Sequence, residues 1–476
     1  MIFPKEKEFY ELKQKHDVVP VVLKVNGDCI TPISLFYNLD GEKKFLLESA
    51  ERGKSWGRYS ILGCNPYLSI KSYGDKVIVD ENGKINERSG KVLDEVKKRI
   101  GSFKIATKNT IAPFSGGAVG YIGYDVVKQY EKINTSNEDK INLPESYLMF
   151  YKNILIYDHF SHLVYIICNV TPSCNQSYME LVKELLEMKE KILKNKKVNE
   201  IGEAREINIE SNFDKEGFIE IVNKAKEYIA KGDAFQVVLS QRLTATTNTH
   251  PFNAYRKLRS INPSPYMFYI DFEDFQIVGS SPESLVKVEG DRVQTNPIAG
   301  TRKRGSTLEE DERLKEELLL DEKERAEHIM LVDLGRNDIG KVCKFGTTTV
   351  DKYMAVEMYS HVMHIVSSVS GQLMEGKDCF DALLACLPAG TVSGTPKVRA
   401  MEIIEELENV KRGIYAGAVG YFDYSGNMDM CIAIRTIVFK DGKAYMQAGG
   451  GIVYDSVPEK EYEESLNKAM VLKEVL

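Results

Sequence analysis

A helix-like stretch in this 476-residue sequence carries acidic side chains where a charged surface gives way to an apolar one. It reads EKERAEHIMLVDLGRND, residues 322–338, with Glu324 four positions before His328 and Glu327 four before Leu331. Residues at that spacing share a helix face, so a carboxylate at the junction would be partly withdrawn from water. Such a carboxylate can hold a cation or move a proton. On this stretch alone, a solvated helix surface is the simpler interpretation.

A second acidic cluster lies near the end of the chain. Glu461, Glu464 and Lys468 are three and four positions apart, which places them on one face of the helix expected from about Glu459. The preceding strand contains three successive glycines, whose N–H groups are open to an anion. Two helices that each present a carboxylate beside such a segment could share a hard cation such as Mg²⁺. Two solvated acidic helices are the alternative.

Cationic and turn residues supply candidates for binding an anion. Arg435 stands inside the apolar run CIAIRTIVF, and a charge in such a run is seldom buried without a partner. Gly300 and Thr301 follow a predicted strand and precede the basic residues 302–304. That segment could hold a carboxylate or phosphate, or it could form a turn with an exposed basic loop. His364 lies in the strand-like run VMHIVSS, where a structural histidine is the default interpretation.

Composition limits the class of protein. The net charge of -7 argues against a nucleic-acid-binding protein, which usually has a basic face. The N-terminal residues lack the apolar core of a signal peptide, and no run is as long as a membrane-spanning helix, so we expect a cytoplasmic protein. The 8 cysteines are scattered, several of them in apolar runs, which favours buried thiols over disulfides or zinc ligands.

Alternating and periodic segments predict an α+β fold. Short strands are expected between Val18 and Val79, and sets of strands with helices between them recur to the end of the chain. We predict mostly antiparallel sheets packed as a sandwich, with helices outside and a substrate cleft between two lobes. The polar stretch 197–211 is the best linker and divides the chain into regions 1–211 and 212–476.

Two further features of the sequence add detail to this predicted fold. GAVGY occurs at 117–121 and again at 417–421, so both halves could contribute strands of shared geometry to one sheet system without a clean boundary. One continuous helix is expected from Thr307 to about Leu334, with Gly335 as its stop. The first acidic cluster would then lie in the second half of that helix.

A series of segments resembles the chorismate-utilising enzymes, and most closely the large subunits (component I) of anthranilate synthases. They are FQVVLSQR, SPESLV, PIAGTRKRG, EHIMLVDLGRND, VMHIVSSVSG, GTVSGTPKVRAM, GAVGYF, CIAIRT, QAGGGIVYDSVPEKEYEE and NKA, in the family's order. The resemblance covers nearly the whole chain and is densest from Phe235 onward.

The resemblance implies roles for individual residues. Glu327 and Glu464 match the family's Mg²⁺ ligands. His364 matches the histidine assigned to proton transfer, and Glu283 and Thr391 match polar residues that border the substrate ring. The positions that match chorismate contacts are Gly300, Thr301, Tyr415, Arg435, Gly449, Gly450 and Gly451, with Lys468 close by. The physics agrees, because a dianionic substrate in an acidic protein needs a metal, a guanidinium and open N–H groups.

The implied reaction is the Mg²⁺-dependent conversion of chorismate and ammonia to anthranilate and pyruvate, the first step of tryptophan biosynthesis. Isochorismate and salicylate synthases have a water-activating lysine where this chain has Gln236. Aminodeoxychorismate synthases of folate biosynthesis usually have a ring-attacking lysine where it has Ala299, and they are the alternative within the family. A catalytically silent binder of chorismate or tryptophan would need a broken site, yet the matched residues are all present.

The N-terminal region matches the family's feedback site. LLES ends at Ser49 and NPSPYM supplies Pro265, Tyr266 and Met267, which together imply an L-tryptophan pocket and inhibition by that amino acid. Taken alone, KFLLES is an ordinary strand end. The sequence contains no glutamine-hydrolysing module, so the resemblance also implies a separate glutamine amidotransferase subunit, component II, as the source of ammonia.

Overall fold

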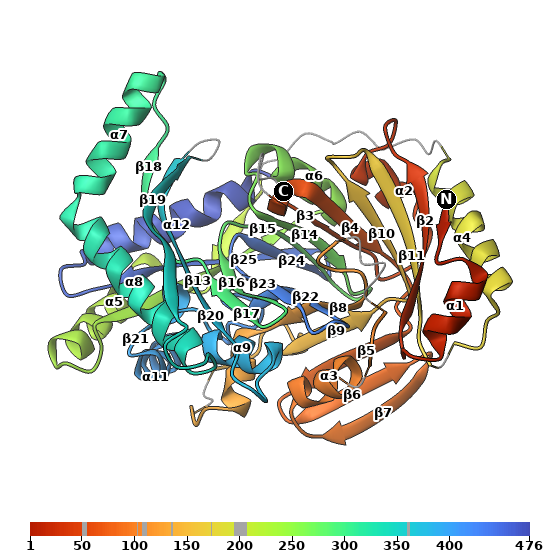
Figure 1. The fold of residues 1–476 in the computed structure, drawn as a ribbon. Helices are drawn as coiled ribbons and strands as arrows, with labels where there is room; N and C mark the ends of the chain where they lie inside the picture. The colour runs from red at the N-terminus through yellow and green to blue at the C-terminus, as the bar shows by residue number, and fades with distance from the viewer. Residues whose placement is uncertain are drawn as a thin grey trace.

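The strands of the protein form two large sheets, and every pairing between named strands is antiparallel (Figure 1). The computed structural model describes residues 1–49, 55–101, 103–106, 112–134, 137–172, 174–194, 207–358 and 362–476. The first sheet has 13 strands. In spatial order they are β1 (Ile2–Phe3), β2 (Val19–Asn26), β11 (Leu163–Val170), β10 (Asn153–Asp158), β4 (Tyr59–Gly63), β3 (Phe45–Glu48), β14 (Tyr266–Asp271), β15 (Gln276–Ser281), β24 (Thr436–Lys440), β25 (Lys443–Ile452), β13 (Gln236–Thr246) and β12 (Ile209–Ser211), with β21 (Gly394–Thr395) paired to β13.

The second sheet has 12 strands. In spatial order they are β18 (Ile298–Lys303), β20 (Val362–Gln372), β17 (Arg292–Thr295), β16 (Ser284–Glu289), β23 (Met428–Ile432), β22 (Ala418–Asp423), β8 (Gly117–Ile122), β9 (Ser146–Phe150), β5 (Leu68–Tyr73), β6 (Lys76–Glu81) and β7 (Lys84–Ser89), with β19 (Thr349–Met358) paired to β20.

The helices lie mainly outside the two sheets (Figure 1). They are α1 (Glu6–Lys13), α2 (Pro32–Asn38), α3 (Val92–Ile100), α4 (Tyr178–Ile192), α5 (Lys215–Ala230), α6 (Pro251–Ile261), α7 (Leu308–Leu320), α8 (Glu322–Gly340), α9 (Cys379–Cys386), α10 (Gly390–Ser393), α11 (Lys397–Leu407) and α12 (Pro458–Lys473). Among the described helices, none is long and apolar enough to cross a lipid bilayer.

The sheets pack face to face through a shared core. Ile156 and Ile277 of the first sheet belong to the same buried cluster as Val119 and Met149 of the second. Because side chains alternate between the faces of a strand, each sheet has a second apolar face that a helix must cover. The α+β sandwich with outer helices is therefore confirmed.

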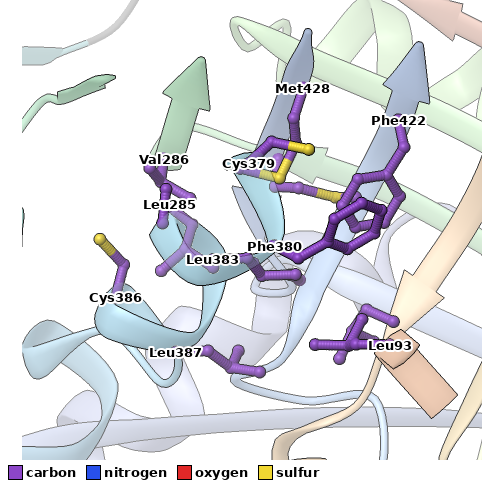
Figure 2. Close-up of a cluster of buried hydrophobic side chains, with 14 of the residues drawn as sticks. Leu93, Leu285, Val286, Cys379, Phe380, Leu383, Cys386, Leu387, Phe422 and Met428 are labelled. Carbon is purple, nitrogen blue, oxygen red and sulfur yellow. The ribbon is translucent and has the colours of Figure 1, made fainter. Parts of the chain in front are cut away.

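Figure 2 shows how α9 covers the outer face of the second sheet. Phe380 stacks on Phe422 of β22, with ring centroids 4.7 Å apart and planes at 18°. Leu383, one turn further along the helix, belongs to the same buried cluster as Leu285 and Met428 on neighbouring strands. This apolar support anchors β16 and β23, the two strands that lead into the candidate site.

The two copies of GAVGY pair with each other. β8 lies antiparallel to β22, with Gly120 opposite Gly420. A Cβ atom would lie 1.9 Å from the Tyr147 carbonyl oxygen at Gly120 and 2.0 Å from the Asp429 carbonyl oxygen at Gly420, so both positions require glycine. β3 likewise pairs with β14. Strands from the two halves of the chain therefore pair with each other in both sheets.

The boundary between regions 1–211 and 212–476 stays a prediction. Residues 195–206, most of the expected linker, lie outside the described part of the chain. β12 begins at Ile209 and pairs with β13, so the end of the expected linker is a strand of the first sheet. In each sheet, apart from β12, the strands of one region form a block that joins the block of the other region, through β3 and β14 in the first sheet and through β8 and β22 in the second.

The single helix expected from Thr307 to Leu334 is wrong. The helix is interrupted at Asp321, which separates α7 from α8. The Asp321 side chain accepts hydrogen bonds from the backbone N–H groups of Lys323 and Glu324 and so caps the start of α8. Gly335 does not end the helix, which continues to Gly340. A Cβ at Gly335 would lie 3.2 Å from Cγ2 of Thr295, so the glycine lets α8 pack closely on β17. α7 extends away from the sheets at one end of the molecule (Figure 1).

Candidate active site

Arg435 lies between β23 and β24 with its side chain among polar residues from distant parts of the chain. Burial lowers the pKa of the guanidinium, and Tyr415, Glu283 and Glu464 lie close enough to oppose that shift. Among the described residues no carboxylate lies within 4.0 Å of it. A cation that is partly withdrawn from water without a bonded counter-ion is costly, so this half-buried group is suited to an anionic ligand.

Glu283 lies at the start of β16, where its carbonyl accepts a hydrogen bond of 3.0 Å from the N–H of Ile432. The Thr391 hydroxyl donates to the Glu283 carboxyl over 2.9 Å. Burial raises the pKa of Glu283 to about 7, although the Thr391 bond and the Arg435 charge act in the opposite direction. The carboxyl is therefore partly protonated near neutral pH and can deliver a proton.

His364 lies on β20 opposite Thr301 of β18. Its Nδ1 atom is 3.1 Å from the Gly300 carbonyl oxygen and 3.0 Å from the Thr301 hydroxyl oxygen. The strand bulges at this point, and Gly300 takes a φ of 72°, which a residue with a side chain rarely adopts. Burial and the Arg435 charge lower the pKa of His364, so the imidazole is neutral at pH 7 and can accept a proton.

The final helix α12 presents its acidic face to β25. A Cβ built on Gly450 would lie 3.2 Å from a carboxylate oxygen of Glu461 and 3.8 Å from one of Glu464. Lys468 pairs with Glu464 at 2.6 Å and donates to the Gly449 carbonyl over 3.1 Å. The predicted shared face of Glu461, Glu464 and Lys468 is therefore present.

The acidic cluster of α8 lies close to that of α12. Burial raises the pKa of Glu327, and the charges of Glu324 and Glu464 raise it further, while Lys323 and Lys468 oppose them. Carboxylates that destabilise one another in this way are relieved by a cation. The two stretches first identified by spacing alone are thus brought into electrostatic contact.

The donor set suits Mg²⁺ better than a metal enclosed by protein ligands. Within the described ranges no three His, Cys, Asp or Glu side chains are grouped to hold a metal ion. Mg²⁺ commonly uses one or two carboxylates and completes its shell with water and substrate oxygens. Glu327 and Glu464 fit that requirement.

The three glycines of β25 combine close packing with an open edge. A Cβ at Gly449 would lie 2.1 Å from the Leu239 carbonyl oxygen, and one at Gly451 would lie 2.2 Å from Nε2 of Gln236. β13 pairs with all three glycines on one side, whereas the pairing with β24 ends at Met446 on the other. Their second edge is therefore not covered by a described strand, and its N–H groups are available to an anion.

Tyr415 links this site to a second arginine. Burial raises the pKa of the phenol to about 12, and the charges of Arg412 and Arg435 lower it. The Arg412 guanidinium lies 5.5 Å from the centre of the Tyr415 ring and forms a buried ion pair of 2.6 Å with Glu408. Arg412 is thus already satisfied by the protein itself.

The two arginines among the basic residues 302–304 are not free to bind an anion. Arg302 donates to Asp321 over 2.8 Å and to Glu317 over 3.3 Å, which ties β18 to α7 and the start of α8. Arg304 forms an ion pair with Asp311 of α7. Two of these cations are therefore committed to carboxylates of the same chain, and they hold the two helices in place.

A separate cavity of about 300 Å³ lies between the two sheets. The four residues predicted for the inhibitor pocket all line it: Ser49, Pro265, Tyr266 and Met267. The Ser49 hydroxyl oxygen is buried and has no hydrogen-bond partner among the described residues. Asp429 also lines the cavity, and burial raises its pKa to about 7.

Two carboxylates that border the site were not assigned from the sequence. Glu324 acts on the pKa of Glu327, and Glu461 faces Gly450 beside Glu464. Each stands three positions before a predicted metal ligand, which is the spacing of one helix turn. That spacing was the available signal, but it does not distinguish a site from a solvated face.

The chain matches the family of chorismate binding enzymes over residues 42–474. Anthranilate synthase component 1 of Acetivibrio thermocellus is 52% identical, with 99% of this chain and 98% of the relative aligned. The protein of the same name from Aquifex aeolicus is 48% identical, with 99% of this chain and 97% of the relative aligned.

Solved structures with a similar fold include another anthranilate synthase component I and an isochorismate synthase. Anthranilate synthase component I from Streptococcus pneumoniae is 40% identical with a TM-score of 0.80, covering 94% of this chain and 98% of that one. The menaquinone-specific isochorismate synthase from Escherichia coli has a TM-score of 0.73 at 19% identity, which shows a shared fold.

Proposed function

The chain belongs to the chorismate-binding enzymes, and from that membership we propose that it converts chorismate and ammonia to anthranilate and pyruvate. The observation that carries the proposal is the half-buried Arg435 guanidinium, which lacks a paired carboxylate in the described chain and lies near Glu283, His364 and Tyr415. An anionic ring with a leaving group and an acidic ring proton needs these elements: a cation, a proton donor and a proton acceptor.

Chorismate carries two carboxylates, so its binding requires several cationic or N–H groups. Arg435 supplies a bidentate guanidinium, and the open edge of Gly449, Gly450 and Gly451 supplies N–H groups. Thr301 and Tyr415 complete the polar wall. Glu327 and Glu464 would hold Mg²⁺, which would neutralise the ring carboxylate and the charge that develops on it.

The proton transfers are assigned from burial and hydrogen bonding. Glu283, held by Thr391, delivers its proton to the C4 hydroxyl, which leaves as water while ammonia forms a bond to C2 of the ring. His364, neutral and hydrogen-bonded to Gly300, then accepts the C2 proton. Loss of that proton with the enolpyruvyl group as pyruvate makes the ring aromatic, and this gain drives the second step.

Two positions favour ammonia as the nucleophile. Ala299, next to the Gly300 bulge on β18, has no amine with which to attack the ring. Gln236 is buried at the start of β13 beside Gly451, and an amide cannot deprotonate water as a lysine amine can. These residues argue against aminodeoxychorismate synthase and isochorismate synthase as alternatives.

The direct test uses purified protein with chorismate, ammonium and Mg²⁺. We expect equal amounts of anthranilate, detected by its fluorescence, and pyruvate, detected enzymatically. Release of aminodeoxychorismate instead would favour the folate enzyme, and isochorismate would show water as the nucleophile. Binding of chorismate without turnover would favour a silent regulator and overturn the proposal.

The cavity between the sheets is proposed as a site for L-tryptophan that inhibits the enzyme. Its volume of about 300 Å³ lies within the range of ligand pockets, and Met267, Phe268 and Val419 give it apolar walls for an indole. The Ser49 hydroxyl, which has no hydrogen-bond partner among the described residues, and the Asp429 carboxyl offer hydrogen bonds to the amino-acid group. This combination suits a ligand with one apolar and one charged end.

A tryptophan titration of the anthranilate assay tests this site. We expect inhibition in the parent enzyme and weaker inhibition, by about fivefold, in Ser49→Ala, because one hydrogen bond is worth about 1 kcal/mol. Ser260→Ala, which alters an exposed hydroxyl on α6, is the matched control. Activity that stays constant up to millimolar tryptophan would sink the idea.

We further propose that a glutamine amidotransferase subunit, component II, delivers the ammonia, and that the complex works in the cytoplasm. The names of the relatives as component 1 support a second component. Glutamine should support turnover when that subunit is added, whereas the chain by itself should require ammonium. Glutamine-dependent activity of the purified chain alone would contradict this arrangement.

A further inference from the structure

The backbone of Arg435 is held in an uncommon conformation from outside the substrate site. Its φ of 50° lies in the left-handed region, which costs a residue with a side chain about 1 kcal/mol or more. Its carbonyl oxygen accepts a hydrogen bond of 3.1 Å from the N–H of Ser280, the next-to-last residue of β15. The direction of the guanidinium therefore depends on where Ser280 lies.

Ser280 in turn is joined to the loop that forms one wall of the inhibitor cavity. Its hydroxyl oxygen lies 2.8 Å from that of Ser264, and it also donates to the Asn262 carbonyl. Both serines are buried. Ser264 immediately precedes Pro265, which lines the cavity, and Ser280 pairs with Met267, another lining residue.

These contacts make one continuous path of short steps. It runs from Pro265 in the cavity wall, through the Ser264 and Ser280 hydroxyls, to the N–H of Ser280 and the carbonyl of Arg435. The links are covalent bonds and buried hydrogen bonds of defined length, and close-packed protein interiors transmit strain. The path ends at the residue that faces the substrate.

We propose that the Ser264–Ser280 hydroxyl contact positions Arg435 and carries inhibition from the cavity to the chorismate site. A ligand that displaces Pro265 moves Ser264, and Ser280 then releases the Arg435 backbone from the conformation that binds the substrate carboxylate. The inference rests on the proposed tryptophan site. It adds a positioning residue, Ser280, that touches neither ligand.

The neighbouring serine provides a contrast on the same strand. The Ser281 hydroxyl donates to the Ile432 carbonyl over 2.7 Å, and Ile432 donates to the Glu283 carbonyl. That contact supports the proton donor rather than the guanidinium. Loss of the Ser281 hydroxyl should therefore lower kcat, whereas loss of the Ser280 hydroxyl should act on the binding of chorismate and on its response to tryptophan.

The test compares Ser280→Ala and Ser280→Thr with the parent enzyme in three measurements: the KM for chorismate, its increase at saturating tryptophan, and the Kd of tryptophan by calorimetry. For Ser280→Ala we expect that increase in KM to shrink by about fivefold or more, with the Kd of tryptophan changed less than twofold. Ser280→Thr, which keeps the hydroxyl, should restore much of the response.

Further variants and outcomes test whether the Ser264–Ser280 contact carries inhibition. Ser264→Ala should behave like Ser280→Ala, and the double variant should be no worse than either, because both remove the same contact. An unchanged tryptophan response in Ser280→Ala would overturn the inference, and so would loss of tryptophan binding, since the hydroxyl would then belong to the cavity. A parent enzyme that does not bind tryptophan would instead refute the proposed inhibitor site.

Discussion

Arg412 and Arg435 approach the same tyrosine, yet only one of them is satisfied by the protein. The Arg412 guanidinium donates to Glu408 over 2.6 Å, to the Val238 carbonyl over 2.7 Å and to the Val392 carbonyl over 2.6 Å. Arg435 has no such carboxylate within 4.0 Å in the described chain. Both charges act on the Tyr415 phenol.

The pKa shifts of the two arginines run in opposite directions for this reason. Burial disfavours the charge of both. At Arg412 the adjacent Glu408 more than compensates, so its pKa is raised. At Arg435 the more distant Tyr415, Glu283 and Glu464 compensate less, and its pKa is lowered. An arginine that is ion-paired within the protein, here called saturated, stabilises the fold. An arginine without a bonded carboxylate, here called unsaturated, is available to a ligand.

The largest effect is expected from removing the unsaturated cation. Arg435→Met should reduce kcat/KM by about a thousandfold, because losing one partner of a buried charged contact costs roughly 2–5 kcal/mol. The free energy of unfolding should be unchanged or slightly higher, since a desolvated charge is removed. Steady-state kinetics and urea unfolding on the same preparation measure both quantities; a strongly destabilised variant would abolish the distinction between the two arginines.

The saturated cation should give the converse result. Arg412→Met leaves Glu408 buried without its counter-ion, so we expect a loss of about 3–5 kcal/mol in the free energy of unfolding. Enzyme that remains folded should retain a KM for chorismate near that of the parent. The measurement is urea unfolding followed by circular dichroism, and wild-type stability in this variant would contradict the assigned role.

Glu283, whose charge acts on the pKa of Arg435, should set a pH dependence. Glu283 donates a proton only when it is protonated, and its pKa is raised to about 7, so kcat should fall as the pH rises through about 7. Glu283→Gln should lower kcat by about a hundredfold and remove that limb of the profile. A limb that persists in the variant would assign the ionisation to another group.

A smaller effect is expected at Glu464, the second carboxylate that acts on the pKa of Arg435. Glu464→Gln should raise the Mg²⁺ concentration required for half-maximal activity by about tenfold or more, since one of two protein ligands is lost. Direct Mg²⁺ titration by calorimetry gives a second reading that does not depend on turnover. Glu463→Gln on the exposed face of α12 is the control and should behave as the parent.

The smallest change concerns the residue that the two arginines share. Tyr415→Phe keeps the ring beside Arg412 and removes the hydroxyl near Arg435, so we expect a few-fold increase in the KM for chorismate and less than about 1 kcal/mol of destabilisation. Steady-state kinetics measure the effect on chorismate binding near Arg435, and thermal unfolding measures the effect on stability near Arg412. A loss of stability that exceeds the kinetic effect would place the hydroxyl in the structural network of Arg412.

The sequence alone was sufficient to predict features that depend on residues close together in the chain. The helical face of Glu461, Glu464 and Lys468 follows from their spacing, because residues three and four apart lie one turn apart. The α+β class follows from alternating strand patterns. The repetition of GAVGY indicated that both halves contribute strands of shared geometry, whereas the pairing of the two copies with each other is a finding of the structure. The motif series also identified the family.

Only the tertiary structure decided which distant residues meet. Glu283 and Thr391 become hydrogen-bonded, and Glu327 comes within electrostatic reach of Glu464, through the pairing and packing of separate sheets and helices. No local period encodes such contacts, since they depend on the order of strands in space. The same limit explains the helix break at Asp321, which a continuous pattern of good helix formers concealed. The sequence singled out Arg435 by its place in an apolar run, but only the structure shows that it lacks the bonded carboxylate that Arg412 has in Glu408.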